Sequence, residues 1–446
     1  MKIFGLKEEE ILKLFERSEI TFAVYGLGKM GLPLAAVIAD KGGKVIGVDI
    51  NKKVVESINR GICHVRGEPG LEEMVARHVK DGRMTATNDL VKAAEDSDVK
   101  IILVPTFLDS MNNPDLSIIK SVSRSISRGL KHGDFVITES TLPPRTTSDI
   151  ILPTLLESGL SRGDFGLAHC PERTMSGRAI QDITGAYPKI VGGIDEKSTK
   201  TAAAIYLGIN SKGVIKVSDA TTAEAVKVFE GLYRDVNIAL ANELAVICHE
   251  LGIDAVETFN TANTQPYSHL HMPGCGVGGH CIPVYPYFIT RTVKSPTRLL
   301  SLSRQINDGM AGYTVSLVEK GLKEAGAGIA NSNVLILGVA YRGDVEETRC
   351  SPAIPIIDIL KRKGAKVFAY DPMLGDRVED FGANPGSFED VSDIDAIVIT
   401  SDFKEFKTID WGRLNLRHKV LVDGRQVVDP EDIRRTGFIF YGIGVK

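Results

Sequence analysis

The sequence lacks several features that would place it in a specialised class of protein. It has no apolar run near the roughly 18 residues that a membrane-spanning helix needs, and its start, Met1-Lys2-Ile3 followed by acidic residues, does not resemble a secretory signal. Six cysteines in 446 residues are too few for a disulfide framework. We therefore expect a protein of the reducing cytoplasm that does not enter a membrane, in which any special cysteine is a nucleophile or a ligand.

A strong charge excess is also missing. The 53 basic and 57 acidic side chains give a formal net charge of −4, and both signs are interspersed along the chain. A general nucleic-acid binder carries a clear basic excess, so we do not expect nucleic acid as a partner. Hydrophobic residues make up 43% and charged residues 25% of the chain, as is usual for globular proteins, and the length allows roughly two to four domains.

The most informative segment lies near the N-terminus. The pattern predicts an apolar strand at 21–25, a glycine turn at 26–31, a helix at 32–40 and a second strand at 44–49. A strand, turn, helix and strand within about 30 residues form a βαβ unit, which requires a parallel sheet. Further strands are predicted at 99–104 and 135–138.

The glycine turn fits the dinucleotide fingerprint. Its first glycine permits a tight turn, its second lets a pyrophosphate approach the backbone, and its third lets helix and strand pack closely. The start of the helix then presents amides to the phosphate. The alternative is a glycine-rich turn in a domain that binds nothing. The predicted NAD-binding residues of the turn are Gly26, Leu27, Gly28, Lys29, Met30 and Gly31.

Asp49 follows Gly31 by 18 residues, at the end of the next predicted strand. A carboxylate there accepts hydrogen bonds from a ribose diol and repels a 2′-phosphate, which favours NAD over NADP. Lys52 and Lys53 weaken this preference slightly.

The middle of the chain has a different character. Residues 221–251 contain no proline and only Gly231 as a weak point, which predicts one long helix or two abutting ones. A single helix of this length would span ~45 Å. It suits a spine between two domains or a subunit interface, and we expect at least a homodimer.

From residue 331 onward the opening pattern returns in outline. A strand is predicted at 333–337, a helix at 352–363 and a strand at 364–371 that again ends in an acid, but the GxGxxG turn is missing. We therefore predict an α/β protein with two Rossmann-like doubly wound domains joined by a long central helix. The expected domains are 1–215 for NAD binding, 216–325 for a central helical dimerisation domain with a cysteine loop, and 326–446 for a second nucleotide-binding domain.

A glycine-rich loop precedes Cys281. Four glycines lie in the six residues 274–279, a degree of backbone freedom that suits a loop on which a ligand closes. The thiol at its end is a candidate nucleophile if its surroundings lower its pKa. A buried structural thiol is the alternative, and we prefer that interpretation for four cysteines outside this loop: Cys63, Cys170, Cys248 and Cys350.

The same loop raises the question of a metal. His269, His271, Cys275, His280 and Cys281 are residue types that zinc accepts. Their spacing matches none of the usual paired patterns, and the glycines would not hold a rigid cage, so we predict no metal site.

Taken together, the motifs resemble those of the UDP-glucose/GDP-mannose dehydrogenase family, from about residue 22 to the C-terminus. Within the family, the branch that acts on UDP-N-acetylhexosamines is the most similar, by CPER at 170–173, DVNIA at 235–239 and GGHC at 278–281. The remaining motifs are GLGKMGLPLA (26–35), VPT (104–106), ESTLPPRTT (139–147), AEAVK (223–227), GVGGHCIP (276–283), YRGDVEETRCSPA (341–353) and DGR (423–425).

The resemblance implies oxidation of a sugar C6 hydroxyl to the uronate, with two NAD and one water consumed. UDP-N-acetyl-D-mannosamine is the expected substrate, and a role in polysaccharide biosynthesis is implied. Cys281 would be the nucleophile that forms a thiohemiacetal and then a thioester. Lys227 would stabilise the oxyanion or relay protons, Glu172 would act on the hydrolytic water, and Thr141 would order that water.

The resemblance also implies binding residues for NAD and for the nucleotide sugar. Guanidinium groups suit a diphosphate, although each arginine is alternatively a surface ion-pair partner. The implied NAD contacts are Thr106, Ser140, Thr141 and Arg349, and the implied contacts to the nucleotide sugar are Glu172, Arg173, Lys227, Gly276, Gly278, Tyr341, Arg342 and Arg425.

Three positions depart from the family pattern. Gly231 stands where the family usually has asparagine four residues after the lysine, and Tyr285 stands where it usually has aspartate four residues after the cysteine. Tyr267 stands where many members have a substrate-binding arginine. These changes affect polar partners near the reactive centre.

Other functions stay open on the sequence alone. UDP-glucose or UDP-N-acetylglucosamine are alternative substrates. A two-electron hydroxyacid dehydrogenase also has a GLGxMG turn and a helical lysine, but it has little use for Cys281 or for a second nucleotide-binding domain. A non-catalytic NAD-binding protein is the third class, favoured only by the three departures.

Overall fold

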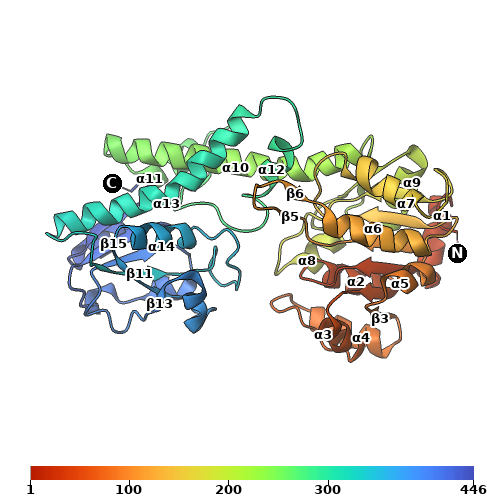
Figure 1. Cartoon of the computed structure of the whole chain (residues 1–446), viewed down its shortest axis with the longest axis horizontal. Coiled ribbons are helices and arrows are strands. Elements are labelled where there is room, and N and C mark those ends of the chain that lie inside the picture. The colour runs from red at the N-terminus through yellow and green to blue at the C-terminus, as the bar shows by residue number, and fades with distance from the viewer. Residues whose placement is uncertain (1, 446) are drawn as a thin grey trace. The chain divides into compact units, whose positions relative to one another are not determined.

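The computed structural model describes residues 2–445. The chain divides into two compact units: one holds the chain up to Glu230 together with Tyr287–Val293, and the other holds Gly231–Pro286 and everything after Val293. In Figure 1 the first unit carries the red to yellow-green elements and the second the teal to blue ones.

The first unit is built on an eight-stranded sheet of order β10-β9-β8-β7-β4-β1-β2-β3. All neighbouring strands are parallel except β8 and β9, which run antiparallel. The strands are β1 (Thr21–Tyr25), β2 (Lys44–Val48), β3 (Met84–Thr87), β4 (Val99–Ile102), β7 (Phe135–Thr138), β8 (Gly166–His169), β9 (Lys189–Gly193) and β10 (Val214–Lys216), with a short β5 (Phe107–Leu108) and β6 (Pro114–Asp115) hairpin beside it.

Alternation along the strands divides the core of this unit into two layers. Phe22 and Val24 of β1 join the layer under α1, α2 and α9, whereas Ala23 and Tyr25 join the layer under α5, α6 and α7. Helices therefore cover both faces of the sheet, as a parallel sheet requires. The helices are α1 (Glu8–Glu16), α2 (Gly31–Asp40), α3 (Lys52–Asn59), α4 (Leu71–Lys80), α5 (Leu90–Asp96), α6 (Ser117–Gly129), α7 (Leu152–Leu156), α8 (Ala179–Gln181) and α9 (Glu196–Leu207).

The second unit contains a fully parallel six-stranded sheet of order β13-β12-β11-β14-β15-β16. Val334 and Ile336 of β11 pack under α13 and α14, and Leu335 and Leu337 pack into the opposite layer. Its elements are α11 (Ala255–Ala262), α12 (Tyr285–Thr290, which continues into the first unit), α13 (Arg298–Glu324), β11 (Asn333–Leu337), α14 (Ala353–Arg362), β12 (Lys366–Tyr370), β13 (Asn384–Pro385), β14 (Ala396–Ile399), β15 (Val420–Asp423), α15 (Pro430–Arg435) and β16 (Ile439–Gly442).

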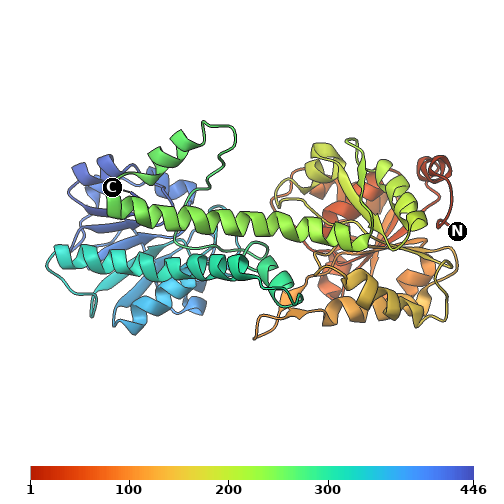
Figure 2. The ribbon, with the colours of Figure 1, turned by 90° about the horizontal axis from the view of Figure 1, so that it is seen from above.

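The long helix is a single element. α10 (Ala220–Leu251) has 32 residues, so the two-helix alternative is wrong. Its later turns lie alongside α13 within the second unit (Figure 2), and buried polar side chains join the two helices. Arg304 pairs with Asp235, and Asn307 donates to the Asp235 carboxylate at 2.9 Å. The predicted class, two Rossmann-like α/β domains with a long central helix, is confirmed.

The predicted strand at 99–104 is too long by two residues, since β4 ends at Ile102. The reason is local: the amide of Val104 donates to the Ser140 hydroxyl at 2.9 Å, so the chain has left the strand ladder by that point. Within residues 2–445, no helix is long and apolar enough to cross a membrane.

Candidate active site

The glycine turn between β1 and α2 has the geometry that its spacing predicts. Gly26 has a φ of +96°, and a β-carbon there would lie 2.3 Å from the carbonyl oxygen of Leu103. A β-carbon at Gly31 would lie 1.8 Å from the carbonyl oxygen of Gly26. Both positions therefore exclude side chains because the chain's own backbone occupies the space.

Gly28 differs from both. A β-carbon at Gly28 would meet no described atom within 4 Å. This glycine is exposed, so it is not required by packing and leaves the backbone open to a ligand from outside. Lys29 beside it is also exposed, whereas Leu27 is buried against β2, where a β-carbon at Gly47 would come within 2.7 Å of its side chain.

Asp49 lies directly after β2 and is half-buried. Its Oδ2 accepts from the amide of Leu27 at 3.1 Å, and its Oδ1 accepts from the amide of Asn51 at 2.9 Å. A carboxylate has about four acceptor positions, so acceptor capacity remains for a ribose diol beside the glycine turn.

The loops after β4 and β7 meet at Ser140. Its hydroxyl accepts from the amide of Val104 at 2.9 Å and donates to the carbonyl of Val104 at 2.7 Å. Ser140 thus fastens the two loops together. Thr106, on one of these loops, has a buried hydroxyl with no hydrogen-bond partner among the described residues.

These observations fit bound NAD. The open backbone at Gly28, the remaining acceptor positions of Asp49 and the unpartnered hydroxyl of Thr106 are the features that a dinucleotide would use. When bound, NAD supplies a hydride acceptor; the groups that handle the sugar and its protons come from the chain.

Glu172 and Lys227 form a polar pair in the first unit. Lys227 Nζ of α10 lies 3.9 Å from Glu172 Oε2, and the two side chains are only 11% and 16% exposed. The amide of Thr174 donates to the other Glu172 oxygen, and the Thr174 hydroxyl lies 3.0 Å from the sulfur of Met30. The loop that carries Glu172 is therefore fastened to the glycine turn.

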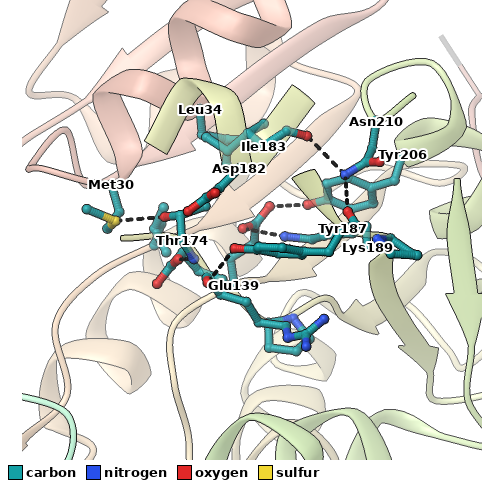
Figure 3. A pocket seen from close by; sticks show the side chains of 15 residues that line it. Met30, Leu34, Glu139, Thr174, Asp182, Ile183, Tyr187, Lys189, Tyr206 and Asn210 are labelled. Carbon is teal, nitrogen blue, oxygen red and sulfur yellow. Dashed lines mark hydrogen bonds and ion pairs between the residues drawn. The ribbon is translucent and has the colours of Figure 1, made fainter. Parts of the chain in front are cut away.

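Glu172 also lines a pocket whose lining residues all belong to the first unit. Figure 3 shows Glu139, Lys189 and Tyr206 directed toward one another. Lys189 Nζ lies 2.8 Å from the buried Glu139 carboxylate, which also accepts from the Tyr206 hydroxyl. Burial, followed by the neighbouring Glu139 charge, raises the pKa of Tyr206 well above its usual value, so this phenol stays a hydrogen-bond donor.

Arg173 lines the same pocket. Its guanidinium lies 2.6 Å from Glu230 and 5.1 Å from the centre of the Tyr187 ring, whose hydroxyl donates to the Arg173 carbonyl. These contacts fix the side chain that the sequence predicts to bind substrate. Sequence reasoning missed Glu139, Lys189, Tyr187 and Tyr206. The one available signal was that Glu139 is the first residue of the ESTLPPRTT motif.

Glu224, one helical turn before Lys227, is a further residue that sequence reasoning missed. Its buried carboxylate accepts from the amide of Arg145 at 2.6 Å and from the amide and hydroxyl of Thr147 at 2.7 and 2.6 Å. It therefore holds the loop that carries Ser140 and Thr141 against the start of α10. Burial raises the pKa of Glu224 to about 7.

The cysteine loop belongs to the second unit and is held by many backbone contacts. The amide of Gly274 donates to Asn242 at 2.8 Å, and the amide of Gly279 donates to the carbonyl of Arg349 at 2.8 Å. A β-carbon at Gly278 would lie 2.4 Å from Tyr341, and one at Gly276 would lie 2.8 Å from Pro352. Close packing within the unit therefore accounts for Gly276 and Gly278.

Cys281 itself is half-buried at the end of this loop. A side-chain hydrogen bond to Cys281 raises the pKa of the neighbouring His280. A protonated imidazole next to a thiol favours the thiolate, which is the nucleophilic form. Sequence reasoning considered His280 only as a metal ligand and missed this contact. No group of three or more potential metal-ligating side chains occurs in the part of the chain that the structure describes.

The remaining predicted residues of the second unit are distributed along the loops after its strands. Arg425 donates to the carbonyls of Thr400 at 3.0 Å and Gly276 at 3.1 Å, so it also supports the cysteine loop. Tyr341 and Arg342 are half-buried, Arg349 is exposed, and Tyr267 is 89% exposed.

The interpretation of four cysteines as buried structural thiols needs a correction. Cys170 and Cys248 are buried, but Cys63 is only partly buried and Cys350 is exposed. Cys350 lies at a left-handed position, with a φ of +51°, in the loop before α14, and this tight turn keeps it out of the core.

Comparisons with known proteins agree with this geometry. The NAD binding domain of the UDP-glucose/GDP-mannose dehydrogenase family matches residues 20–210, its central domain matches 221–309, and its UDP binding domain matches 335–430. UDP-N-acetyl-D-mannosamine dehydrogenase of Pyrococcus horikoshii is 38% identical over 427 residues, which cover 95% of this chain and 98% of that protein.

Solved structures give the same result. The Pyrococcus horikoshii UDP-D-ManNAc dehydrogenase has a TM-score of 0.87 at 35% identity and covers 95% of this chain and 99% of that one. An NDP-N-acetyl-D-galactosaminuronic acid dehydrogenase from Methanosarcina mazei has a TM-score of 0.84 at 31% identity, with 99% and 98% covered. The chain therefore belongs to the UDP-glucose/GDP-mannose dehydrogenase family and is an NAD-dependent nucleotide-sugar 6-dehydrogenase.

Proposed function

We propose that this enzyme oxidises the C6 hydroxyl of UDP-N-acetyl-D-mannosamine to the carboxylate, with four electrons transferred to two NAD. The observation that carries the proposal is the Glu172–Lys227 pair, whose loop is fastened to the glycine turn through Thr174 and Met30. The names of the similar proteins from Pyrococcus horikoshii support the sugar. UDP-glucose and UDP-N-acetylglucosamine are the alternatives, and the uronate product suits polysaccharide biosynthesis.

The first oxidation needs a group that takes the proton of the C6 hydroxyl as the hydride leaves. Lys227 is proposed to relay this proton and to stabilise the oxygen as it becomes negative. Its ammonium is mostly buried and faces a carboxylate oxygen at 3.9 Å, a distance that leaves its donors available to a substrate oxygen.

The second oxidation needs a tetrahedral carbon that still carries a hydrogen. Cys281 is proposed to add its sulfur to the aldehyde carbon, while the oxygen takes a proton, which gives a thiohemiacetal. Loss of the second hydride from this carbon, together with the proton of the hydroxyl group, leaves a thioester on Cys281. Glu172, with Thr141 ordering the water, is proposed to remove a proton from the attacking water, which releases the carboxylate and the thiol.

The proposed domains are 1–215, 216–325 and 326–446, with UDP-sugar contacts from Tyr341, Arg342 and Arg425. We also propose a homodimer formed through α10, in the cytoplasm. Large apolar side chains on α10 are exposed at intervals of four and seven residues, as one face of a helix requires: Phe229, Tyr233, Leu240, Ile247 and Leu251. Light scattering that finds only monomer at working concentration would contradict the dimer.

The chemistry is tested by product stoichiometry with a panel of UDP- and GDP-sugars. Two NADH per carboxylate formed are expected, because each oxidation releases one hydride. Cys281→Ser should stop carboxylate formation, with Cys248→Ser as a control thiol outside the loop. One NADH per substrate, or carboxylate formed by Cys281→Ser at the native rate, would overturn the thioester route.

A further inference from the structure

Two of the positions that depart from the family pattern lie against each other in the second unit. A β-carbon added to Gly231 would lie 2.4 Å from Cδ2 of the Tyr285 ring and 3.3 Å from its Cε2 and Cγ. Real β-carbons do not approach another atom as closely as the first distance, and the other two are tighter than most real contacts. The ring of Tyr285 therefore occupies the space that any larger residue at 231 would need.

The helix itself gives no reason for a glycine at this position. Gly231 lies inside the continuous helix α10, where its backbone is helical. Glycine destabilises a helix interior relative to alanine because it has more conformational freedom to lose. Room for the Tyr285 ring is the feature of the structure that accounts for Gly231.

Tyr285 is also tied to the nucleophile. Its amide donates to the carbonyl of Cys281 at 2.9 Å, and the amide of Val284 donates to the same carbonyl at 3.1 Å. This turn begins at Cys281 and ends at Tyr285, where α12 starts. The tyrosine is only 7% exposed, so the end of the turn carries a buried side chain.

We propose that Tyr285, seated on Gly231, is a positioning residue for Cys281 and replaces the polar pair that the family pattern leads one to expect at these two positions. An asparagine at 231 and the ring at 285 exclude each other sterically, so the two positions must change together. The inference deepens the proposed function, in which Cys281 is the nucleophile.

The exchange also alters the surroundings of the thiol. An aspartate four residues after Cys281 would place a negative charge on the same turn, and a nearby negative charge disfavours a thiolate. With tyrosine there, the turn carries no such charge. Tyr285→Asp is therefore expected to slow alkylation of Cys281 by about threefold or more, both by removing the buried ring and by adding the charge.

A double-mutant cycle tests the pairing. The variants are Gly231→Asn, Tyr285→Asp and the two combined, and the readout is the rate of Cys281 alkylation by iodoacetamide, followed on the Cys281 peptide because Cys350 is also exposed. Gly231→Asn should change the rate by about fivefold or more when Tyr285 is present, and by less than about twofold when it is introduced together with Tyr285→Asp. Equal effects in both backgrounds would overturn the proposal.

Two further variants serve as controls for the cycle. Gly309 on α13 is exposed, and a β-carbon there would meet nothing within 4 Å in the described chain, so Gly309→Asn should leave the alkylation rate nearly unchanged. Tyr285→Phe keeps the ring, so in that background Gly231→Asn should change the alkylation rate of Cys281 as much as it does when Tyr285 is present. If Gly231→Asn does not fold, Gly231→Ala carries the β-carbon alone, and coupling of the urea midpoints replaces the alkylation rate.

NADH production separates this inference from the proposed function. If the wild-type enzyme forms no NADH with any UDP- or GDP-sugar while the cycle still shows coupling, the substrate proposal fails and the pairing stands. If NADH forms at two per carboxylate and the cycle shows no coupling, the function stands and the positioning role of Tyr285 is wrong.

Discussion

The two units place an aspartate at the same point of the same motif and use it differently. Asp49 follows β2 in the first unit, and Asp371 follows β12 in the second. In each case the preceding turn contains a glycine with a positive φ, +96° at Gly26 and +91° at Gly338. The first aspartate is half-buried, whereas the second is 1% exposed.

The difference lies in how many backbone amides each carboxylate accepts. Asp371 accepts from four, those of Val339, Ala340, Met373 and Leu374, at 2.7 to 3.1 Å. Asp49 accepts from two. A carboxylate has about four acceptor positions, so Asp371 has none to offer a ligand and Asp49 has two. An acid at the end of a strand therefore indicates a ribose site only where the surrounding turn leaves it partly free.

The largest effect that this comparison predicts is on stability. Asp371→Ala removes a carboxylate shared by four amides, two of which belong to the fully buried Val339 and Ala340, and should lower the free energy of unfolding by about 3 kcal/mol or more. Asp49→Ala, in a half-exposed position, should lower it by less than about 1 kcal/mol. Urea denaturation of the two variants measures the difference. Similar losses would show that the two aspartates are structural to the same degree.

The next effect is on cofactor binding. Asp49→Ala should weaken NAD by ~2 kcal/mol, the order of a charge-assisted hydrogen-bond pair, which is roughly a thirtyfold rise in Kd. The preference for NAD over NADP should shrink as well, because the charge that repels a 2′-phosphate is gone. Isothermal titration with both cofactors measures this. Asp40→Ala, at the far end of α2 and paired with Arg77 on the surface, is the control and should leave both constants unchanged.

The sequence alone was sufficient to predict the structure where a motif depends only on nearby residues. The strands β1, β7 and β11 and the turn glycines followed from periodicity and spacing, because each depends on neighbours a few residues away. Contacts between distant segments were not predictable in this way. Nothing near Glu224 in the sequence shows that its carboxylate meets Arg145 and Thr147, and nothing near Gly231 shows the ring of Tyr285. Lys100 of β4 is fully buried and pairs with Asp134, and the apolar pattern of the strand likewise does not predict a buried lysine there.

Glu224 extends the comparison to a third carboxylate that accepts hydrogen bonds from backbone amides. Burial raises the pKa of Glu224 to about 7. Its folded-state pKa lies above the unfolded value near 4.5, so the stability linked to this group is full below about pH 4.5 and declines as the pH rises through about 7.

Glu224→Gln removes this titration and turns amide hydrogens toward the amides of Arg145 or Thr147, so the variant should be less stable than the wild type at low pH. Because only the wild type loses stability through this group, the gap in Tm between the two proteins should narrow from about pH 5 to about pH 8. Thermal unfolding at unit pH steps measures the gap. A gap that stays constant or widens would mean that Glu224 is ionised throughout this range, and that the hydrogen bonds it accepts outweigh the effect of its burial.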